Sequence, residues 1–393
     1  MIIWACLIIP FAASAILYFG WKHRVEAWEI ILPFAASVIF ILISKYTIEH
    51  FQVSDTEFWT GYITKTEYYE PWTEQYTVVV TTTDSKGQAH SHTETRIRHH
   101  PAEYYIIDNN DIKLGVSAGE YRRLVNKFGF GEVKKDLHHF GQISFGDGDM
   151  FYCNYPNDRS KMEVCTTTHS YENRVKASKS VFNFEKIKNP EALGLYSYPK
   201  ITGYNAVPSI LNYTGIDSLA ADFELCKRNA ELGRAKEVRM WILLFKDKSI
   251  ATALQQQAYW VNGNKNDFVL CVGCNHTGEV DWAYSFSWCE NERLKTDVKN
   301  FAQNQTKLDL MSIVKYMSNQ VQEHFQRKHF EDFNYLTVEP PTWAITLTFC
   351  LVGLMNFGLG VWIVQNDHGI HPCCLPMSRH NPFLQKTSKW GKR

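Results

Sequence analysis

The fold is decided by MIIWACLIIPFAASAILYFG at residues 1–20 and by PPTWAITLTFCLVGLMNFGLGVWIVQN at residues 340–366, because neither stretch contains a charged side chain. An α-helix rises about 1.5 Å per residue, so each stretch can cross a hydrocarbon core about 30 Å thick. A third apolar run, residues 30–44, extends into its flanks as a helix of about 28–46. The sequence therefore predicts three membrane spans, at about 2–20, 28–46 and 340–366.

The two N-terminal runs share the segment PFAAS, at residues 10–14 and again at 33–37. Ala and Ser let membrane helices approach closely, so the repeat predicts a packing face between the two helices. Chance recurrence among apolar residues is the alternative. The nine residues 21–29 between the runs leave room only for a tight turn, which predicts an antiparallel hairpin of helices within residues 1–45.

Basic residues near the spans set the orientation. Lys22 and Arg24 lie in the first turn, and five Lys and Arg lie in the tail, residues 367–393. Three spans place both segments on one side of the membrane, which the positive-inside rule assigns to the cytoplasm. We therefore expect an integral membrane protein, with residues 46–339 extracytoplasmic and a basic cytoplasmic tail.

The charge balance excludes one broad class of function. The 393 residues contain 41 Lys and Arg and 41 Asp and Glu. A nucleic-acid-binding domain would carry a basic surplus. We therefore expect no nucleic-acid partner, and the lipid bilayer and another membrane or envelope protein as partners.

The middle of the chain contains two regions that differ in predicted secondary structure, joined by a connection. Residues 46–184 are rich in β-forming residues, including a predicted hairpin of 76–83 with 90–97 around the turn 84–87, and a helical patch at 119–128. Residues 185–216, with three prolines, predict an irregular connection. Residues 217–339 predict an α/β domain of these elements in order: helix 217–233, strand 238–245, helix 249–261, strand 268–272, strand 280–288 and helical sequence from 290 to about 330. The predicted class is an α+β membrane protein.

A polar loop between a helix and a strand is the strongest candidate ligand cleft. Asn264, Lys265, Asn266 and Asp267 occur together there, beside aromatic residues that could line a cleft at the end of a sheet. An ordinary loop rich in turn-forming residues is the alternative. The aromatic candidates are Tyr259, Trp260 and Trp288.

Two cysteines are candidates for a disulfide. Cys153 and Cys165 lie at equal distances from Arg159, so a hairpin centred there would place them opposite each other. Two free buried thiols are the alternative. A CxxC pair at 271–274 runs into a turn and a strand, whereas redox-active pairs occupy a helix start.

Metal binding has only weak candidates. His90 and His92 share one face of a predicted strand. No GxSxG, Walker A or HExxH motif occurs, so no catalytic residue is assigned. The expectation is therefore no cofactor, with a divalent metal ion as the alternative.

Four stretches of the middle segment stand out: FWTGYITKTEYY at 58–69, TTTHSYENRV at 166–175, YWVNGNKNDF at 259–268 and FNYLTVEPP at 333–341. They resemble a family of uncharacterised membrane proteins of bacteria and tailed phages. The resemblance covers about residues 54–341 and implies a bacterial inner membrane as the location, but no known activity.

Residues 236–330 are also similar to the TPM domain in the order of their elements and in their place before a C-terminal span. That similarity implies either a membrane-anchored assembly factor or a phosphatase. Our first functional hypothesis is a non-enzymatic binding or assembly domain at the cell envelope. The competing hypothesis is a membrane-tethered, metal-dependent hydrolase that uses Asp247 and Asp267. The sequence leaves the oligomeric state open.

Overall fold

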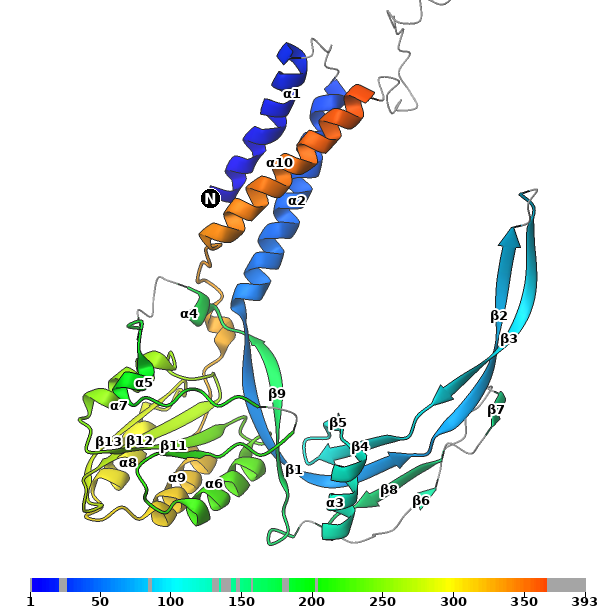
Figure 1. Ribbon diagram of the computed structural model, residues 1–393. Coiled ribbons are helices and arrows are strands. Elements are labelled where there is room, and N and C mark those ends of the chain that lie inside the picture. The colour runs from blue at the N-terminus through cyan, green and yellow to red at the C-terminus, as the bar shows by residue number, and fades with distance from the viewer. Residues whose placement is uncertain are drawn as a thin grey trace, which may run out of the picture. The chain divides into compact units, whose positions relative to one another are not determined.

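The computed structural model describes residues 2–20, 27–83, 87–128, 134–135, 143–145, 149–156, 158–178, 184–201 and 204–365 (Figure 1). The chain divides into two compact units. The helical unit comprises Met1–Val53 and Val338–Arg393, and the αβ unit comprises Ser54–Thr337. The predicted basic segments around Lys22 and in the tail, 367–393, lie outside the described residues.

The helical unit contains α1 (Ile8–Gly20), which follows a 3₁₀ helix η1 (Ile2–Leu7), α2 (Ala27–Val53) and α10 (Thr342–Gln365). Two of its helices, α2 and α10, are long and apolar enough to cross a membrane. The apolar part of the first helix, Ile3–Ile16, is shorter than that. α2 continues beyond the predicted end at residue 46, and β1 begins at the next residue, Ser54.

The repeated PFAAS segment lies where α1 and α2 pack. The ring centroids of Phe11 and Phe34 are 5.4 Å apart. Ser37 Oγ donates to the carbonyl of Pro33 within α2 at 2.7 Å and accepts a 3.0 Å hydrogen bond from Asn356 Nδ2 of α10. The two copies of the repeat therefore lie side by side, but the contact comes from their phenylalanines, while Ala12 and Ala35 are exposed and Ser37 contacts the third helix.

One half of the αβ unit is a four-stranded sheet in the order β10 (Ile210–Asn212), β11 (Arg239–Lys246), β12 (Asp267–Cys274) and β13 (Val280–Ser287). The first three strands are parallel, and β12 and β13 form an antiparallel hairpin. Gly278 adopts a φ of 82° in the turn between them, as the Thr277-Gly278 sequence favours.

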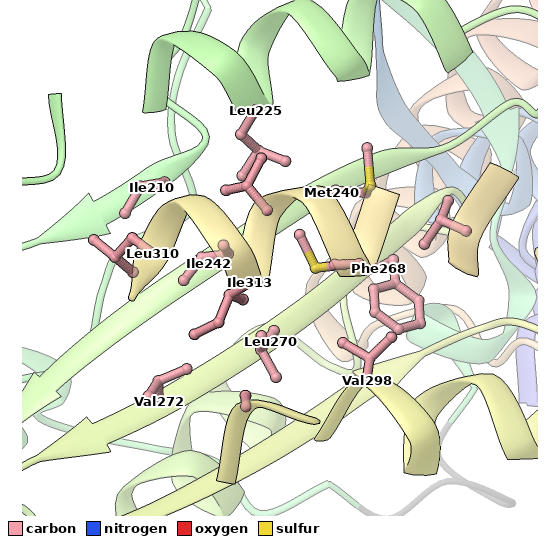
Figure 2. Close-up of a cluster of buried hydrophobic side chains, with 14 of the residues drawn as sticks. Ile210, Leu225, Met240, Ile242, Phe268, Leu270, Val272, Val298, Leu310 and Ile313 are labelled. Atoms are coloured by element: carbon pink, nitrogen blue, oxygen red, sulfur yellow. The ribbon is translucent and has the colours of Figure 1, made fainter. Parts of the chain in front are cut away.

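Side chains of β11 and β12 alternate between two cores, as strand geometry requires. Met240, Ile242 and Leu270 lie on one face, among residues of α6, α8 and α9 (Figure 2). Trp241, Leu243 and Val269 lie on the other face, with Ala253 of α7. The helices of this half are α6 (Leu219–Leu232), α7 (Ala251–Tyr259), α8 (Glu292–Gln303) and α9 (Leu310–His324). The predicted order of strands and helices is confirmed.

The other half of the αβ unit is built on one long strand, β1 (Ser54–Tyr69). Its first part pairs with β9 (Val164–Glu172), and its second part pairs with β4 (Glu103–Asp108) and β8 (Met150–Asn154). β5 (Lys113–Gly115) and β6 (Lys134–Lys135) extend that sheet. The predicted helical patch forms as α3 (Ala118–Phe128).

A separate three-stranded sheet contains the predicted hairpin. β2 (Trp72–Thr83) pairs with β3 (Ala89–His100) along its whole length, and β7 (Ile143–Phe145) pairs with β2 only at residues 73–75. The hairpin prediction is confirmed, while most of its turn, residues 84–86, lies outside the described residues. The remaining short helices are α4 (Arg174–Ala177), α5 (Pro190–Leu193) and the 3₁₀ helix η2 (Phe330–Phe333).

The two halves belong to a single unit, without the separation that the sequence suggested at 185–216. The reason is that β1 binds directly to the four-stranded sheet. Asn266 Nδ2 donates to the carbonyl of Phe58 at 2.8 Å, and buried Arg239 donates to Thr60 Oγ1. A side chain at Gly233 would collide with the Thr60 carbonyl, so this glycine permits the close approach of α6 to β1.

Candidate functional site

A polar pocket of about 210 Å³ lies beside the loop that precedes β12. Its lining comes from the end of β9, from this loop, and from the segment that follows α9. Basic and aromatic groups dominate it. The lining residues are Tyr171, Glu172, Lys265, Arg327, Lys328, His329, Phe330, Glu331 and Asn334.

Lys265 is held in place by Tyr171. Its backbone N–H donates to the Tyr171 hydroxyl at 3.4 Å, and its Nζ lies 4.6 Å from the centroid of the Tyr171 ring. A cation above an aromatic face gains electrostatic attraction while it remains able to bind an anion. Lys265 is thus a positioned cation at the pocket wall.

A buried carboxylate, Glu57 of β1, stands beside two of the lining cations. Glu57 Oε1 accepts a 3.0 Å hydrogen bond from Trp59 Nε1 and lies 3.5 Å from Lys265 Nζ and 3.6 Å from Arg327 Nη1. Burial raises the pKa of Glu57, and the charges of Lys265 and Arg327 act in the opposite direction. Among the described residues, Glu57 Oε2 and Arg327 Nη1 have no hydrogen-bond partner.

The remaining charges of the lining are mixed: Glu331 is an exposed carboxyl group of the pocket wall, and Lys328 forms its basic end. Arg327 also pairs with Glu237 at 2.6 Å, and Glu172 pairs with Arg174 at 2.7 Å. In the part of the chain that the structure describes, Lys328 forms no ion pair. The pocket can therefore accept an anionic group through Lys328, with Lys265 and Arg327 beside it.

Trp288 connects the two segments that form the pocket. Its Nε1 donates to the carbonyl of Gly263 at 3.1 Å, and its carbonyl accepts the backbone N–H of Lys328 at 2.8 Å. The rings of Phe330 and Phe333 pack against its indole edge-on, with centroids 5.7 and 5.9 Å away. Trp288, a predicted cleft residue, is therefore the support of the pocket and does not line it.

Of the seven predicted cleft residues, Lys265 alone lines this pocket. Asp267 is fully buried, and it accepts hydrogen bonds from Trp241 Nε1 at 2.9 Å, from the Tyr198 hydroxyl at 2.7 Å and from the Asn264 N–H at 2.7 Å. Burial raises the pKa of Asp267 to about 6. The carboxylate thus organises the loop, and the prediction that it faces a ligand is corrected.

The other predicted cleft residues are also structural. Asn264 Nδ2 donates to the Tyr198 hydroxyl, and Asn266 holds β1 through the carbonyl of Phe58. Trp260 Nε1 donates to the carbonyl of Tyr196 at 2.7 Å, and Tyr259 packs beside that same core. Turn-forming amides and aromatics at this position therefore build an αβ loop, as the alternative interpretation held.

The acidic metal candidates lie at opposite ends of the sheet. In the parallel register Asp267 stands opposite Arg239, at the start of β11, whereas Asp247 follows Lys246 at its end. Eight residues at about 3.3 Å each separate them by about 26 Å, so they cannot share one ion. His92 on β3 contacts Glu94 at 3.1 Å, and no group of three or more possible ligands occurs among the described residues. The described residues therefore give no support to a metal site at His90 and His92.

The two candidate disulfide cysteines are buried, and no disulfide joins them. The hairpin expected between them does not form, because the long β1 pairs with both strands that carry them. Cys153 stands opposite Thr66, and Cys165 stands opposite Gly61, on different parts of β1. Burial also raises the pKa of the Cys165 thiol, which disfavours the reactive thiolate.

The sequence prediction missed most of the pocket. One local signal was present: Arg327, Lys328 and His329 are consecutive basic residues just after a helix. Glu57 and Tyr171 gave no such signal, because they reach the pocket only through the pairing of β1 with β9. Comparisons with protein-family models, curated proteins and solved structures give no match.

Proposed function

We propose that this chain is an integral membrane protein whose αβ unit is a non-enzymatic binding or assembly domain at the cell envelope. In this proposal α1, α2 and α10 all span the membrane, residues 46–339 lie outside the cytoplasm, and the basic tail lies inside. The length and apolar character of α2 and α10 support the membrane part. The Lys and Arg of the turn and the tail support the orientation.

The observation that carries the binding function is the convergence of Lys265, Arg327 and Lys328 on one pocket. Ligand pockets for whole small molecules measure about 300–1,000 Å³. A pocket of about 210 Å³ is below that range, so it suits one anionic group better than an entire substrate. We infer that the pocket receives an acidic side chain or a terminal carboxylate of a partner protein in the envelope.

Site-specific photo-crosslinking in cells tests this proposal. A photoreactive amino acid at His329, an exposed residue of the pocket wall, should give one discrete adduct with a partner protein. Tyr213 is 85% exposed in the same unit, outside the pocket lining, and serves as the matched position that should give none. Lys328→Glu should remove the adduct through charge repulsion.

Lys315→Glu makes the same charge change on an exposed part of α9 and should leave the adduct unchanged. An adduct that survives Lys328→Glu, or one that forms equally from Tyr213, would refute the pocket as the binding site. The orientation has its own test. A reporter fused after Arg393 should read as cytoplasmic, and an extracytoplasmic signal would invert the proposed topology.

The alternative, a TPM-like phosphatase, has less support. It rested on Asp247 and Asp267 sharing a divalent ion, and these residues lie at opposite ends of β11 and β12. The full chain with Mg²⁺ should therefore not hydrolyse p-nitrophenyl phosphate. Metal-stimulated turnover that disappears in Asp267→Asn would favour the phosphatase over a binding domain.

A further inference from the structure

The hairpin of β2 and β3 has little support from the rest of its own chain. The two strands pair over twelve residues, and every residue of β3 except Glu94 and His100 is exposed. Figure 1 shows the pair as a long two-stranded ribbon. Isolated two-stranded hairpins are marginally stable in water, because they bury too little apolar surface. This ribbon would gain stability from a further strand.

The outer edge of β3 is open to such a strand. Among the described residues, β3 pairs with β2 alone. Natural edge strands are commonly protected by charged side chains, Pro or a bulge. β3 (AHSHTETRIRHH) has no Pro and no register shift with β2, and its charged residues include both signs, so they can be paired by a suitable partner strand. No described strand pairs with the outer edge of residues 91–99, so its outward N–H and C=O groups form a regular template for strand addition.

The charges of β3 suit a second copy of the same strand. Consider an antiparallel pair related by a twofold axis perpendicular to the sheet. The axis keeps each residue on the same face in both copies, and directly opposed side chains also share a face. The residue numbers of two opposed residues therefore differ by an even number. An axis through Glu94 would oppose Glu94 to itself, and an axis through Arg96 would oppose Arg96 to itself. Like charges in such positions are destabilising.

An axis through Thr95 removes these conflicts. Glu94 of each copy then stands opposite Arg96 of the other, which forms two cross-strand pairs of opposite charge. In the same register Thr93 of one copy stands opposite Ile97 of the other. Residues 90–100 of each copy are paired along their whole length, with residue 90 opposite residue 100. Within one chain Glu94 Oε2 already accepts a hydrogen bond from Arg96 at 3.2 Å, so both groups lie on this face.

We propose that β3 pairs antiparallel with β3 of a second copy, with Thr95 on the twofold axis. The product is a four-stranded sheet that joins two αβ units. The backbone groups of the open edge supply the hydrogen bonds, and the two Glu94–Arg96 pairs select the register. This interface is independent of the pocket beside Lys265.

Cysteine crosslinking of the full chain tests the register. Opposed residues in an antiparallel pair have Cα atoms about 4.5–5.5 Å apart, within the range that a disulfide spans. Thr95→Cys should therefore form a dimer on mild oxidation. Thr93→Cys is the matched control, because its equivalent in the second copy lies about 14 Å away along and across the strands. The unsubstituted chain sets the background from Cys350, which is exposed.

Charge reversal tests the selection of the partner. In the Thr95→Cys background, Glu94→Arg should lower the yield of crosslinked dimer about tenfold, because two attractive pairs become repulsive. Adding Arg96→Glu restores opposite charges in both pairs and should restore the yield. A hairpin that merely unfolds would not recover in this way. Equal crosslinking of Thr93→Cys and Thr95→Cys, or a double reversal that fails to recover, would overturn the proposal.

Discussion

β12 and β3 are strands of the same unit in opposite surroundings. All eight residues of β12 are buried, whereas β3 buries none of its twelve fully. β12 lies between two cores, one with α8 and α9 and one with α7. β3 has a single neighbouring strand in the described structure. The extended conformation of β12 is therefore stabilised by packing within the chain, whereas that of β3 depends on pairing with another molecule.

This contrast locates the stability of the unit in its four-stranded sheet. Burying a Leu or Val side chain contributes about 1.5–3 kcal/mol, and β12 buries several of them. The hairpin buries few apolar groups, and Val79 and Ile97 remain 68% and 61% exposed. Substitutions in the two strands should consequently have very different effects on unfolding, which the following variants measure in the full chain.

Leu270→Ala in the middle of β12 should have the largest effect. Leu270 is fully buried in the core of Figure 2, so its removal leaves a cavity between the sheet and the helices. We expect the free energy of unfolding to fall by about 3 kcal/mol. Urea titration followed by pulse proteolysis of the full chain measures the change. A loss below 1 kcal/mol would contradict the assignment of this sheet as the stabilising core.

The next largest effect concerns pH and the first residue of β12. Burial raises the pKa of Asp267 to about 6. Since this exceeds the unfolded value of about 3.9, the folded state favours the protonated acid, and this contribution is fully present below about pH 4. As the pH rises through about 6, this stabilisation is lost, and the free energy of unfolding falls by on the order of 3 kcal/mol.

Asp267→Asn is the control, because its amide does not titrate. Other carboxyl groups titrate in the same pH range. Subtracting the pH dependence of unfolding measured for the variant removes their contribution. The difference between the two unfolding profiles should therefore decline from pH 4 to pH 6. A difference that stays flat, or that rises with pH, would show that Asp267 is not buried as the structure describes.

Continuous apolar sequence explains why the buried strands were predicted well. The apolar run at 238–245 and the one at 268–272 are recognisable because neighbouring residues all face a core, as in parallel sheets covered on both sides. The role of Asp267 was not recognisable. Its hydrogen-bond donors, Trp241 and Tyr198, come from other segments, and nothing local indicates that their side chains point toward it.

The pocket was beyond prediction for the same reason. Lys265 and Arg327 come together over Glu57, which is more than 200 residues earlier in the sequence and reaches them through the pairing of β1 with the rest of the unit. The Cys153–Cys165 pairing failed similarly, because the length of β1 allows it to bind both strands. Local patterns thus predicted elements, while the positions of side chains from distant segments required the structure.

Glu57→Gln should have an intermediate effect. It relieves the burial that raises the pKa of Glu57, but it leaves Lys265 and Arg327 without the carboxylate that they share. The second effect is the larger, so we expect a loss of about 1–2 kcal/mol of unfolding free energy. The loss is smaller than for a fully buried pair, because both cations retain some access to water. Glu331→Gln, at an exposed carboxyl group of the same pocket, is the matched control and should change stability by less than about 0.5 kcal/mol. Equal effects of the two variants would place Glu57 among the surface charges.

Ile97→Ala in β3 should have the smallest effect on unfolding of the monomer. The side chain is exposed, so its loss should cost less than about 0.5 kcal/mol, although it removes as many carbon atoms as Leu270→Ala. Dilute and concentrated samples should differ, however. Ile97 stands opposite Thr93 of the second copy in the proposed register, so the same substitution should weaken the dimer at high concentration. A cost above 1 kcal/mol in dilute monomer would mean that the hairpin packs against its own chain, and the contrast with β12 would fail.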